Sequence, residues 1–263
     1  MNRAHRVLDP SRGKAIPKGL CALAIMTKAP HAGRVKTRLT PPLTPQEAAA
    51  LNVCFLRDTS DLVASTVRAA PARGIAVYTP AGTEEAYAGV VPDTFELLLQ
   101  RGEALEERIM SAIEDLLGLG FDSVCLINSD SPTVPPRAFA EATRILSEKE
   151  NPVVLGPSDD GGYYLIGLKK LHRPLFENIR WSTEQVLEQT LQRAQESDLG
   201  VHLLPPWYDV DNGDGLRRLC RELFAGEGHS DASPAPATRK YLEDIMKREG
   251  RERIWPDDEQ PCS

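Results

Sequence analysis

The sequence predicts an α/β fold, in which a mainly parallel β-sheet is covered by helices on both faces. Short apolar segments alternate with longer amphipathic segments along the 263 residues. Connections of this length favour parallel pairing, because a parallel crossover needs a dozen or more residues. Residues 20–26 are apolar almost throughout, which is typical of a strand buried on both faces.

The predicted elements follow one another in regular alternation. The predicted strands are residues 20–26, 75–78, 96–99, 123–127, 153–156, 163–168 and 201–204. The predicted helices are residues 44–68, 103–117, 135–147, 182–196 and 211–224. Thr44 is the expected N-cap of the first helix, with Pro45 in its first turn and Glu47 completing a capping box. Ser182 and Gln185 predict a second capping box.

One catalytic domain, residues 19–225, is expected between two less regular ends. Residues 1–18 are polar and rich in turn formers, which indicates a flexible leader. Residues 226–236 are rich in Gly, Ser, Pro and Ala and read as a linker. The charged amphipathic stretch 239–253 is expected to form a peripheral C-terminal helix, so residues 226–263 form the third segment.

Composition excludes several classes of protein. The formal net charge of −7 argues against a nucleic-acid binder, which needs a basic face. Five cysteines without CxxC spacing predict neither a disulfide framework nor a zinc site, and they favour a reducing cytoplasm. No apolar run approaches the ~20 residues of a membrane span, and no secretory signal is expected. Nothing in the sequence predicts the oligomeric state.

A basic loop follows the first predicted strand. In open parallel sheets, ligands bind beyond the carboxyl ends of the strands. Residues 27–39 carry four cations in an acidic protein, and such a loop can wrap a polyphosphate with lysines, arginine forks and backbone N–H groups. The alternative is a solvated basic loop. The candidate phosphate-binding residues are Lys28, Gly33, Arg34, Lys36, Thr37 and Arg38.

Three acids at strand ends are candidate ligands for Mg²⁺ or Mn²⁺. Asp130 follows the fourth predicted strand, and Asp209 and Asp211 follow the last. Mg²⁺ often takes only one or two carboxylates together with phosphate oxygens. Asp130 could instead form an Asx-turn, and Asp211 could be the N-cap of the final helix.

The turn at residues 157–164 is a candidate substrate site. Two acids precede two glycines, which would let a ligand approach the backbone closely, although a simple tight turn is the alternative. Trp181 precedes a helix N-terminus, where an acceptor anion could bind. The candidate substrate-binding residues are Asp159, Asp160, Gly161, Gly162, Tyr163 and Trp181. Neither GxGxxG nor GxxxxGK[ST] occurs, which argues against Rossmann cofactor binding and P-loop hydrolysis.

These segments together resemble the DUF2064 glycosyltransferase group of the nucleotide-diphospho-sugar transferase superfamily. The matching stretches are residues 26–30, 33–39, 55–58, 130–132, 159–164 and 207–211. The resemblance implies a GT-A fold, with Asp130 in the place of the superfamily's metal-binding acid. The loop Lys36-Thr37-Arg38-Leu39 is also similar to the phosphate loop of phospholactate guanylyltransferases.

The resulting hypothesis is a metal-dependent transferase that uses a nucleotide-activated donor, with Asp130 and Lys36 as catalytic residues. Transfer of a sugar from a nucleotide-diphospho-sugar to a small acceptor is one reaction. The alternative is nucleotidyl transfer from an NTP to a small phosphate or phosphonate, which the cations Lys28, Lys36 and Arg38 favour because pyrophosphate must leave. A non-catalytic nucleotide sensor is an alternative of another class.

Overall fold

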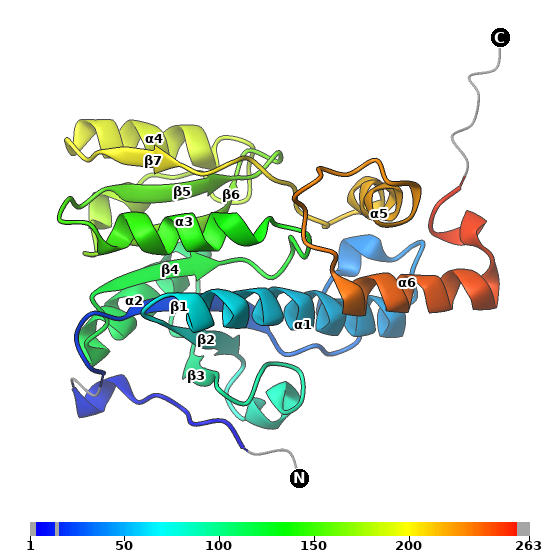
Figure 1. The fold of residues 1–263 in the computed structure, drawn as a ribbon, viewed down its shortest axis with the longest axis horizontal. Helices are drawn as coiled ribbons and strands as arrows, with labels where there is room; N and C mark the ends of the chain where they lie inside the picture. The colour runs from blue at the N-terminus through cyan, green and yellow to red at the C-terminus, as the bar shows by residue number, and fades with distance from the viewer. Residues whose placement is uncertain (1–3, 14–15, 257–263) are drawn as a thin grey trace.

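A seven-stranded β-sheet forms the centre of the protein (Figure 1). The computed structural model describes residues 4–13 and 16–256. The strand order is β3-β2-β1-β4-β6-β5-β7, and within the described residues β6 alone runs antiparallel to its neighbours. The strands are β1 (Cys21–Lys28), β2 (Ala72–Thr79), β3 (Glu96–Leu99), β4 (Ser123–Ile127), β5 (Val153–Pro157), β6 (Tyr163–Leu168) and β7 (Val201–Leu203). The predicted seven strands and the mainly parallel sheet are confirmed.

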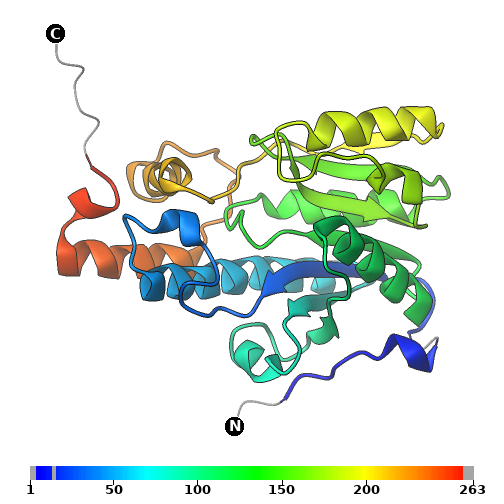
Figure 2. The ribbon, with the colours of Figure 1, turned by 180° about the vertical axis from the view of Figure 1, so that it is seen from behind.

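Helices cover both faces of the sheet. The helices are α1 (Pro45–Ala69), α2 (Leu105–Leu119), α3 (Pro136–Ser147), α4 (Val186–Glu196), α5 (Gly213–Cys220) and α6 (Pro236–Glu249). Helices α1 and α3 lie on one face, and α2 and α4 lie on the opposite face (Figure 2). None of the described helices is both long enough and apolar enough to cross a membrane.

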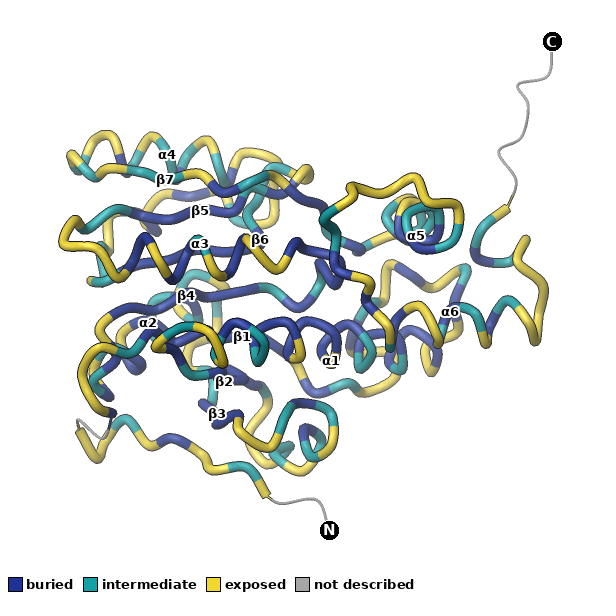
Figure 3. Tube along the Cα trace, viewed as in Figure 1, coloured by how far each residue is buried: buried dark blue, intermediate teal, exposed yellow. Residues whose placement is uncertain are grey.

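The core is divided by the sheet into two apolar layers. Along β1, Leu23 and Ile25 belong to the layer under α1 and α3, whereas Ala22 and Ala24 belong to the layer under α2. Successive side chains of a strand point to opposite faces, so a strand covered on both sides must be apolar throughout. The buried segments in the middle of the molecule follow this pattern (Figure 3).

The start of α1 agrees with the prediction. The backbone N–H of Glu47 donates to Thr44 Oγ1 at 3.2 Å, and the backbone N–H of Thr44 donates to Glu47 Oε2 at 2.9 Å. This capping box satisfies two backbone donors that the first helical turn cannot pair internally.

The predicted starts of two other helices are wrong. Helix α4 begins at Val186, and Ser182 adopts a left-handed conformation with φ of 61° instead of capping the helix. The N–H of Leu187 donates to Gly161 O at 2.8 Å, so the β5–β6 turn occupies the N-terminus of α4. Helix α5 is capped by Asn212, because its Oδ1 accepts from Gly215 N–H at 3.0 Å. Asp211 is thereby free for another contact.

Both ends of the described chain pack on the domain. The N–H of Leu8 donates to Leu97 O at 2.7 Å, which places part of the predicted leader along the edge of β3. Helix α6 packs along α1 and buries Leu242 and Ile245 (Figure 1). The division of the chain at residues 18 and 225 stays a prediction.

We expect Asp58→Ala to destabilise the attachment of α6. Asp58 is buried on α1, and its carboxylate accepts the N–H groups of Ala237 at 2.9 Å and Thr238 at 2.8 Å. The variant would leave these donors without a partner, at a cost of about 3 kcal/mol in the free energy of unfolding. Asp61→Ala is the matched control, since Asp61 is exposed on the same helix. Chemical denaturation gives the free energy of unfolding of both variants. Equal losses in the two would contradict the role of Asp58 as the cap of α6.

Candidate active site

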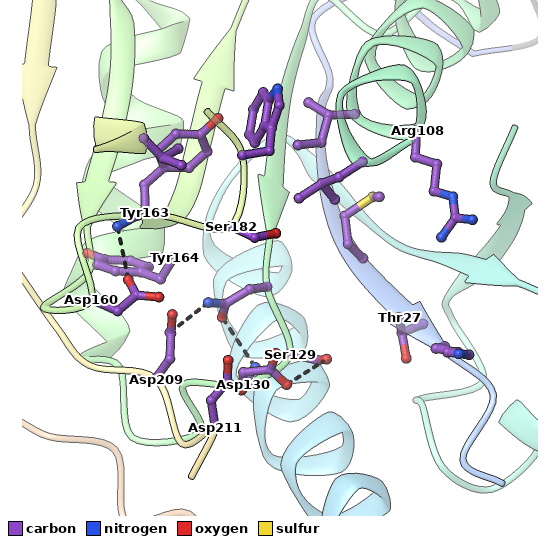
Figure 4. Close-up of a pocket in the computed structure, with 18 of the residues that line it drawn as sticks. Thr27, Arg108, Ser129, Asp130, Asp160, Tyr163, Tyr164, Ser182, Asp209 and Asp211 are labelled. Carbon is purple, nitrogen blue, oxygen red and sulfur yellow. Dashed lines mark hydrogen bonds between the residues drawn. The ribbon is translucent and has the colours of Figure 1, made fainter. Parts of the chain in front are cut away.

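An open cleft lies beyond the carboxyl ends of β1 and β4. Its volume is about 1150 Å³. The basic loop after β1 and the start of α2 line one side, while the β5–β6 turn and residues 180–186 line the other (Figure 4). The strand-end acids after β4 and β7 form its floor between these two sides. This is the position in which open α/β sheets bind ligands.

Lys36 crosses the floor of the cleft and binds two of the predicted metal ligands. Its Nζ lies 2.6 Å from Asp130 Oδ1 and 2.9 Å from Asp211 Oδ1, and it donates to Val210 O at 2.9 Å. The same ammonium lies 5.4 Å from the centre of the Phe55 ring. Only 5% of the Lys36 side chain is exposed. The lysine is thus a buried, fully engaged cation.

The two carboxylates keep this lysine charged. Burial lowers the pKa of Lys36, but the negative charges of Asp130 and Asp211 outweigh this effect, so that the net shift of the pKa is upward. Lys36 therefore stays protonated through the physiological pH range and cannot act as a base in this arrangement.

Asp209 is held by three side-chain donors. Its Oδ1 accepts from Asn128 Nδ2 at 2.7 Å and from the hydroxyl of Ser131, and its Oδ2 accepts from Ser158 Oγ at 2.9 Å. Because these donors come from the ends of β4 and β5, Asp209 ties the loop after β7 to both strands. Its carboxylate is oriented by the protein even without a ligand.

The pKa of the Asp209 carboxyl group is raised above its ordinary value. Burial raises its pKa, the hydrogen bond from Ser131 opposes the shift, and the nearby charges of Asp130 and Asp160 raise it further, to about 6. Carboxyl groups with perturbed pKa values are typical of functional sites when they lie in clefts.

The basic loop presents free cations to the cleft. Lys28, Arg34 and Arg38 are exposed and line the cleft, and within the described part of the chain none of them forms an ion pair. Thr37 lines the cleft beside them. Gly33 shapes the turn, with φ of 72°, but does not line the cleft.

The candidate substrate turn is divided between the cleft and the outer surface. Asp160 and Tyr163 line the cleft (Figure 4), and Trp181 also lines it. Asp159 does not line it, because its carboxylate pairs with Arg218 at 2.6 Å. Tyr163 packs in the core beside the cleft, and burial raises the pKa of its hydroxyl.

Gly161 and Gly162 have different roles in this turn. Gly161 has φ of 83°, and a Cβ placed there would lie 2.1 Å from Glu184 O, so only glycine fits between the two loops. Gly162 lines the cleft, and its N–H donates to Asp160 Oδ1 at 2.9 Å, which orients that carboxylate.

The wall of the cleft formed by α2 was not predicted from the sequence. Arg108 points into the cleft from the first turns of this helix (Figure 4), and it forms no ion pair among the described residues. Leu105 lines the same wall with 45% of its surface exposed. Gln100 lies at the end of β3 and donates to Thr27 O at 3.0 Å. Residues 100–108 directly follow a parallel strand, and this position could have identified them as part of the ligand-binding edge.

The predicted metal ligands do not accommodate a divalent ion as they are arranged. Carboxylates suit Mg²⁺ and Mn²⁺, but the ammonium of Lys36 lies between Asp130 Oδ1 and Asp211 Oδ1, where a shared ion would lie. The oxygens of Asp209 accept hydrogen bonds from three side chains. Among the described residues, no group of three or more His, Cys, Asp or Glu side chains is arranged to hold a metal.

The fold is that of the nucleotide-diphospho-sugar transferase class. The chain is similar to a “putative nucleotide-diphospho-sugar transferase” from Desulfovibrio desulfuricans G20, with 28% identity over 88% of this chain and 97% of that one and a TM-score of 0.73. The family described as “Uncharacterized protein conserved in bacteria (DUF2064)” matches residues 62–183. This match confirms the resemblance predicted from the motifs.

More distant similarity extends to two synthases. CMP:2-keto-3-deoxy-manno-octonic acid synthetase complexed with CTP is 12% identical, with 80% of this chain and 100% of that chain covered and a TM-score of 0.48. 4-Diphosphocytidyl-2C-methyl-D-erythritol synthase from Anaerococcus prevotii DSM 20548 is 12% identical, with 74% and 94% covered and a TM-score of 0.47. Among curated proteins, none matches this chain.

Proposed function

We propose that this protein transfers a sugar from a nucleotide-diphospho-sugar to a small acceptor. The observation that carries the proposal is that positively and negatively charged side chains occupy different parts of the cleft. Lys28, Arg34 and Arg38 line one side and have no acidic partner among the described residues, while Asp160 lies on the other side and the strand-end acids form the floor. Unpaired cations suit a diphosphate, and carboxylates suit the hydroxyls of a sugar or acceptor. The similarity to the Desulfovibrio protein supports the same class.

The residues of the cleft suit the steps of glycosyl transfer. An acceptor oxygen attacks the anomeric carbon and forms a new C–O bond. The bond between that carbon and the diphosphate oxygen breaks, and the nucleoside diphosphate leaves with the electron pair beside the basic loop. Asp160 Oδ1 already accepts a hydrogen bond from Gly162 N–H. No described group donates to Asp160 Oδ2, so this oxygen would accept the proton of the attacking acceptor hydroxyl.

Nucleotidyl transfer is the second candidate, and the three unpaired cations favour it. In that reaction a phosphate or phosphonate oxygen of the acceptor attacks the α-phosphorus of an NTP. The bond from the α-phosphorus to the bridging oxygen breaks, and pyrophosphate leaves with the electron pair. Lys28, Arg34 and Arg38 would stabilise that charge. Dependence on Mg²⁺ or Mn²⁺ and a reducing cytoplasmic location stay predictions for both reactions.

We expect one class of nucleotide to stabilise the protein strongly. A ligand at ~100 times its Kd adds about 2.7 kcal/mol to the free energy of unfolding, which a thermal-shift assay detects. The panel contains the four NTPs and common nucleotide-diphospho-sugars, each with Mg²⁺, Mn²⁺ or EDTA. Stabilisation by a nucleotide-diphospho-sugar, but not by its NTP, supports glycosyl transfer, whereas preference for an NTP supports nucleotidyl transfer. No response to any nucleotide would contradict both.

Phosphorus NMR of a turnover reaction separates the outcomes further. Release of a nucleoside diphosphate identifies glycosyl transfer, and release of pyrophosphate identifies nucleotidyl transfer. Binding without either product would identify the protein as a nucleotide sensor. The control for the thermal-shift panel is the double variant Arg34→Ala/Arg38→Ala. It removes two free cations and should reduce the increase in melting temperature that the nucleotide causes.

A further inference from the structure

Asn52 is a buried polar side chain on α1 that lines the cleft. Only 5% of the residue is exposed. Its amide group can donate two hydrogen bonds and accept two, but it forms none with any group in the described part of the chain. Buried side-chain polar groups are nearly always paired, so an unpaired amide in the wall of a cleft indicates a ligand that pairs with it.

Helix α1 fixes the place of Asn52 in the cleft. Asn52 and Phe55 are three positions apart and therefore lie on the same face of the helix. The centre of the Phe55 ring is 5.4 Å from Lys36 Nζ, which places Asn52 beside the floor of the cleft. The 3-10 turn Thr37–Leu39 packs against the same helix. Because α1 and these neighbours enclose the rest of the residue, a binding partner reaches the amide from the cleft.

Thr59 on the same helix shows what distinguishes Asn52. Only 2% of Thr59 is exposed, and its hydroxyl has no partner among the described residues. This hydroxyl has almost no accessible surface, and Thr59 does not line the cleft. No ligand can reach Thr59, whereas Asn52 combines the same lack of a partner with a place in the cleft wall.

The amide group of Asn52 suits hydroxyl groups better than phosphate groups. A diphosphate offers acceptor oxygens, so it would pair with Nδ2 and leave Oδ1 facing a negative charge. A hydroxyl both donates and accepts, and two neighbouring hydroxyls of a sugar can pair with both ends of one amide. A hydroxyl also reproduces the hydrogen bonds of a water molecule that it displaces, so its binding loses none of them.

We propose that Asn52 binds neighbouring hydroxyl groups of a sugar in the ligand. The ribose of a nucleotide and a transferred sugar both carry such hydroxyls. The presence of this sugar in a nucleotide-diphospho-sugar rests on the proposed function, whereas the pairing of the amide with hydroxyls does not. Asn52 is thus a specificity-determining residue, which favours a hydroxylated ligand over its deoxy analogue.

Calorimetry tests this inference with simple probes: ribose 5-phosphate, glucose 1-phosphate, their 2-deoxy analogues and inorganic pyrophosphate. Wild type should bind at least one of the two sugar phosphates about tenfold more tightly than its deoxy analogue. Asn52→Leu replaces the amide by an apolar group of similar shape and should lose this preference, while its affinity for pyrophosphate stays unchanged. The sugar phosphate that responds to the variant identifies ribose or the transferred sugar as the partner of Asn52.

Thr59→Val is the matched control, because it removes another unpaired polar group from α1 away from the cleft. It should keep the preference for the hydroxylated probe. Asn52→Leu should unfold at the same denaturant concentration as wild type or a higher one, since it removes a buried polar group without a partner. Asn52→Ala should also lose the preference, and it serves as the second variant if Asn52→Leu folds poorly or its larger apolar group hinders the ligand.

Three results would overturn the inference: an equal preference in wild type and both Asn52 variants, an equal loss of pyrophosphate affinity, or no binding of any sugar-bearing probe by wild type. The nucleotide that stabilises the protein in the thermal-shift panel is measured on the same variants. If it binds wild type and the Asn52 variants equally well, the inference fails and the proposed function stands. If the sugar phosphates bind through Asn52 but no nucleotide binds, the proposed function fails and the inference stands.

Discussion

Asp130→Asn is expected to lower turnover of the nucleotide donor by roughly 100-fold, the usual cost of losing one preorganised electrostatic group. The carboxylate lies at the carboxyl end of β4 and 2.6 Å from Lys36 Nζ. Asparagine keeps the shape but removes the charge that positions the cation on the floor of the cleft. Because Lys36 keeps its contacts with Asp211 and the Val210 carbonyl, the free energy of unfolding should fall by no more than about 2 kcal/mol.

Steady-state kinetics and thermal unfolding of the same preparation check this expectation. Asp214→Asn is the control: Asp214 lies in the first turn of α5, is 84% exposed and does not line the cleft. It should retain wild-type turnover. An Asp130→Asn enzyme with undiminished turnover would remove Asp130 from the catalytic residues, and a large loss of stability would instead assign it a structural role.

Local chemistry explains why much of the fold was predictable. The strand β1 is apolar on both faces because helices cover both, and this requirement is visible in consecutive residues. The capping box of α1 involves residues three apart, Thr44 and Glu47, so it could be predicted from spacing alone. The acids at strand ends were identified for a similar reason: the position of Asp130 after an apolar run places it at the ligand-binding edge of the sheet.

The contacts that the sequence did not predict join residues far apart in the chain. Lys36 and Asp211 are 175 positions apart, and only the fold brings the predicted phosphate loop onto the predicted metal ligands. Asp159 and Asp160 are adjacent and chemically identical, yet Arg218 holds the first outside the cleft while the second lines it. Local propensity also failed at Ser182, because a neighbouring loop occupies the helix N-terminus that it was expected to cap.

Gly161→Ala is expected to cause the largest loss of stability among single substitutions in the turn between β5 and β6. The left-handed conformation of this residue, with φ of 83°, is strained for alanine, and the added Cβ would lie 2.1 Å from Glu184 O. Overlap with backbone cannot be relieved by rotating a side chain. We expect a combined cost of roughly 3–5 kcal/mol, from the conformational strain together with overpacking.

Gly82→Ala separates these two contributions. Gly82 has nearly the same φ, 81°, but no atom lies within 4 Å of its added Cβ. This variant should lose only about 1 kcal/mol, the conformational cost alone. Chemical denaturation gives both values, and equal losses would show that the contact with Glu184 is not tight. If Gly161→Ala kept its stability but lost nucleotide binding, the loop carrying Trp181 would have moved aside, and the wall of the cleft would depend on this one close approach.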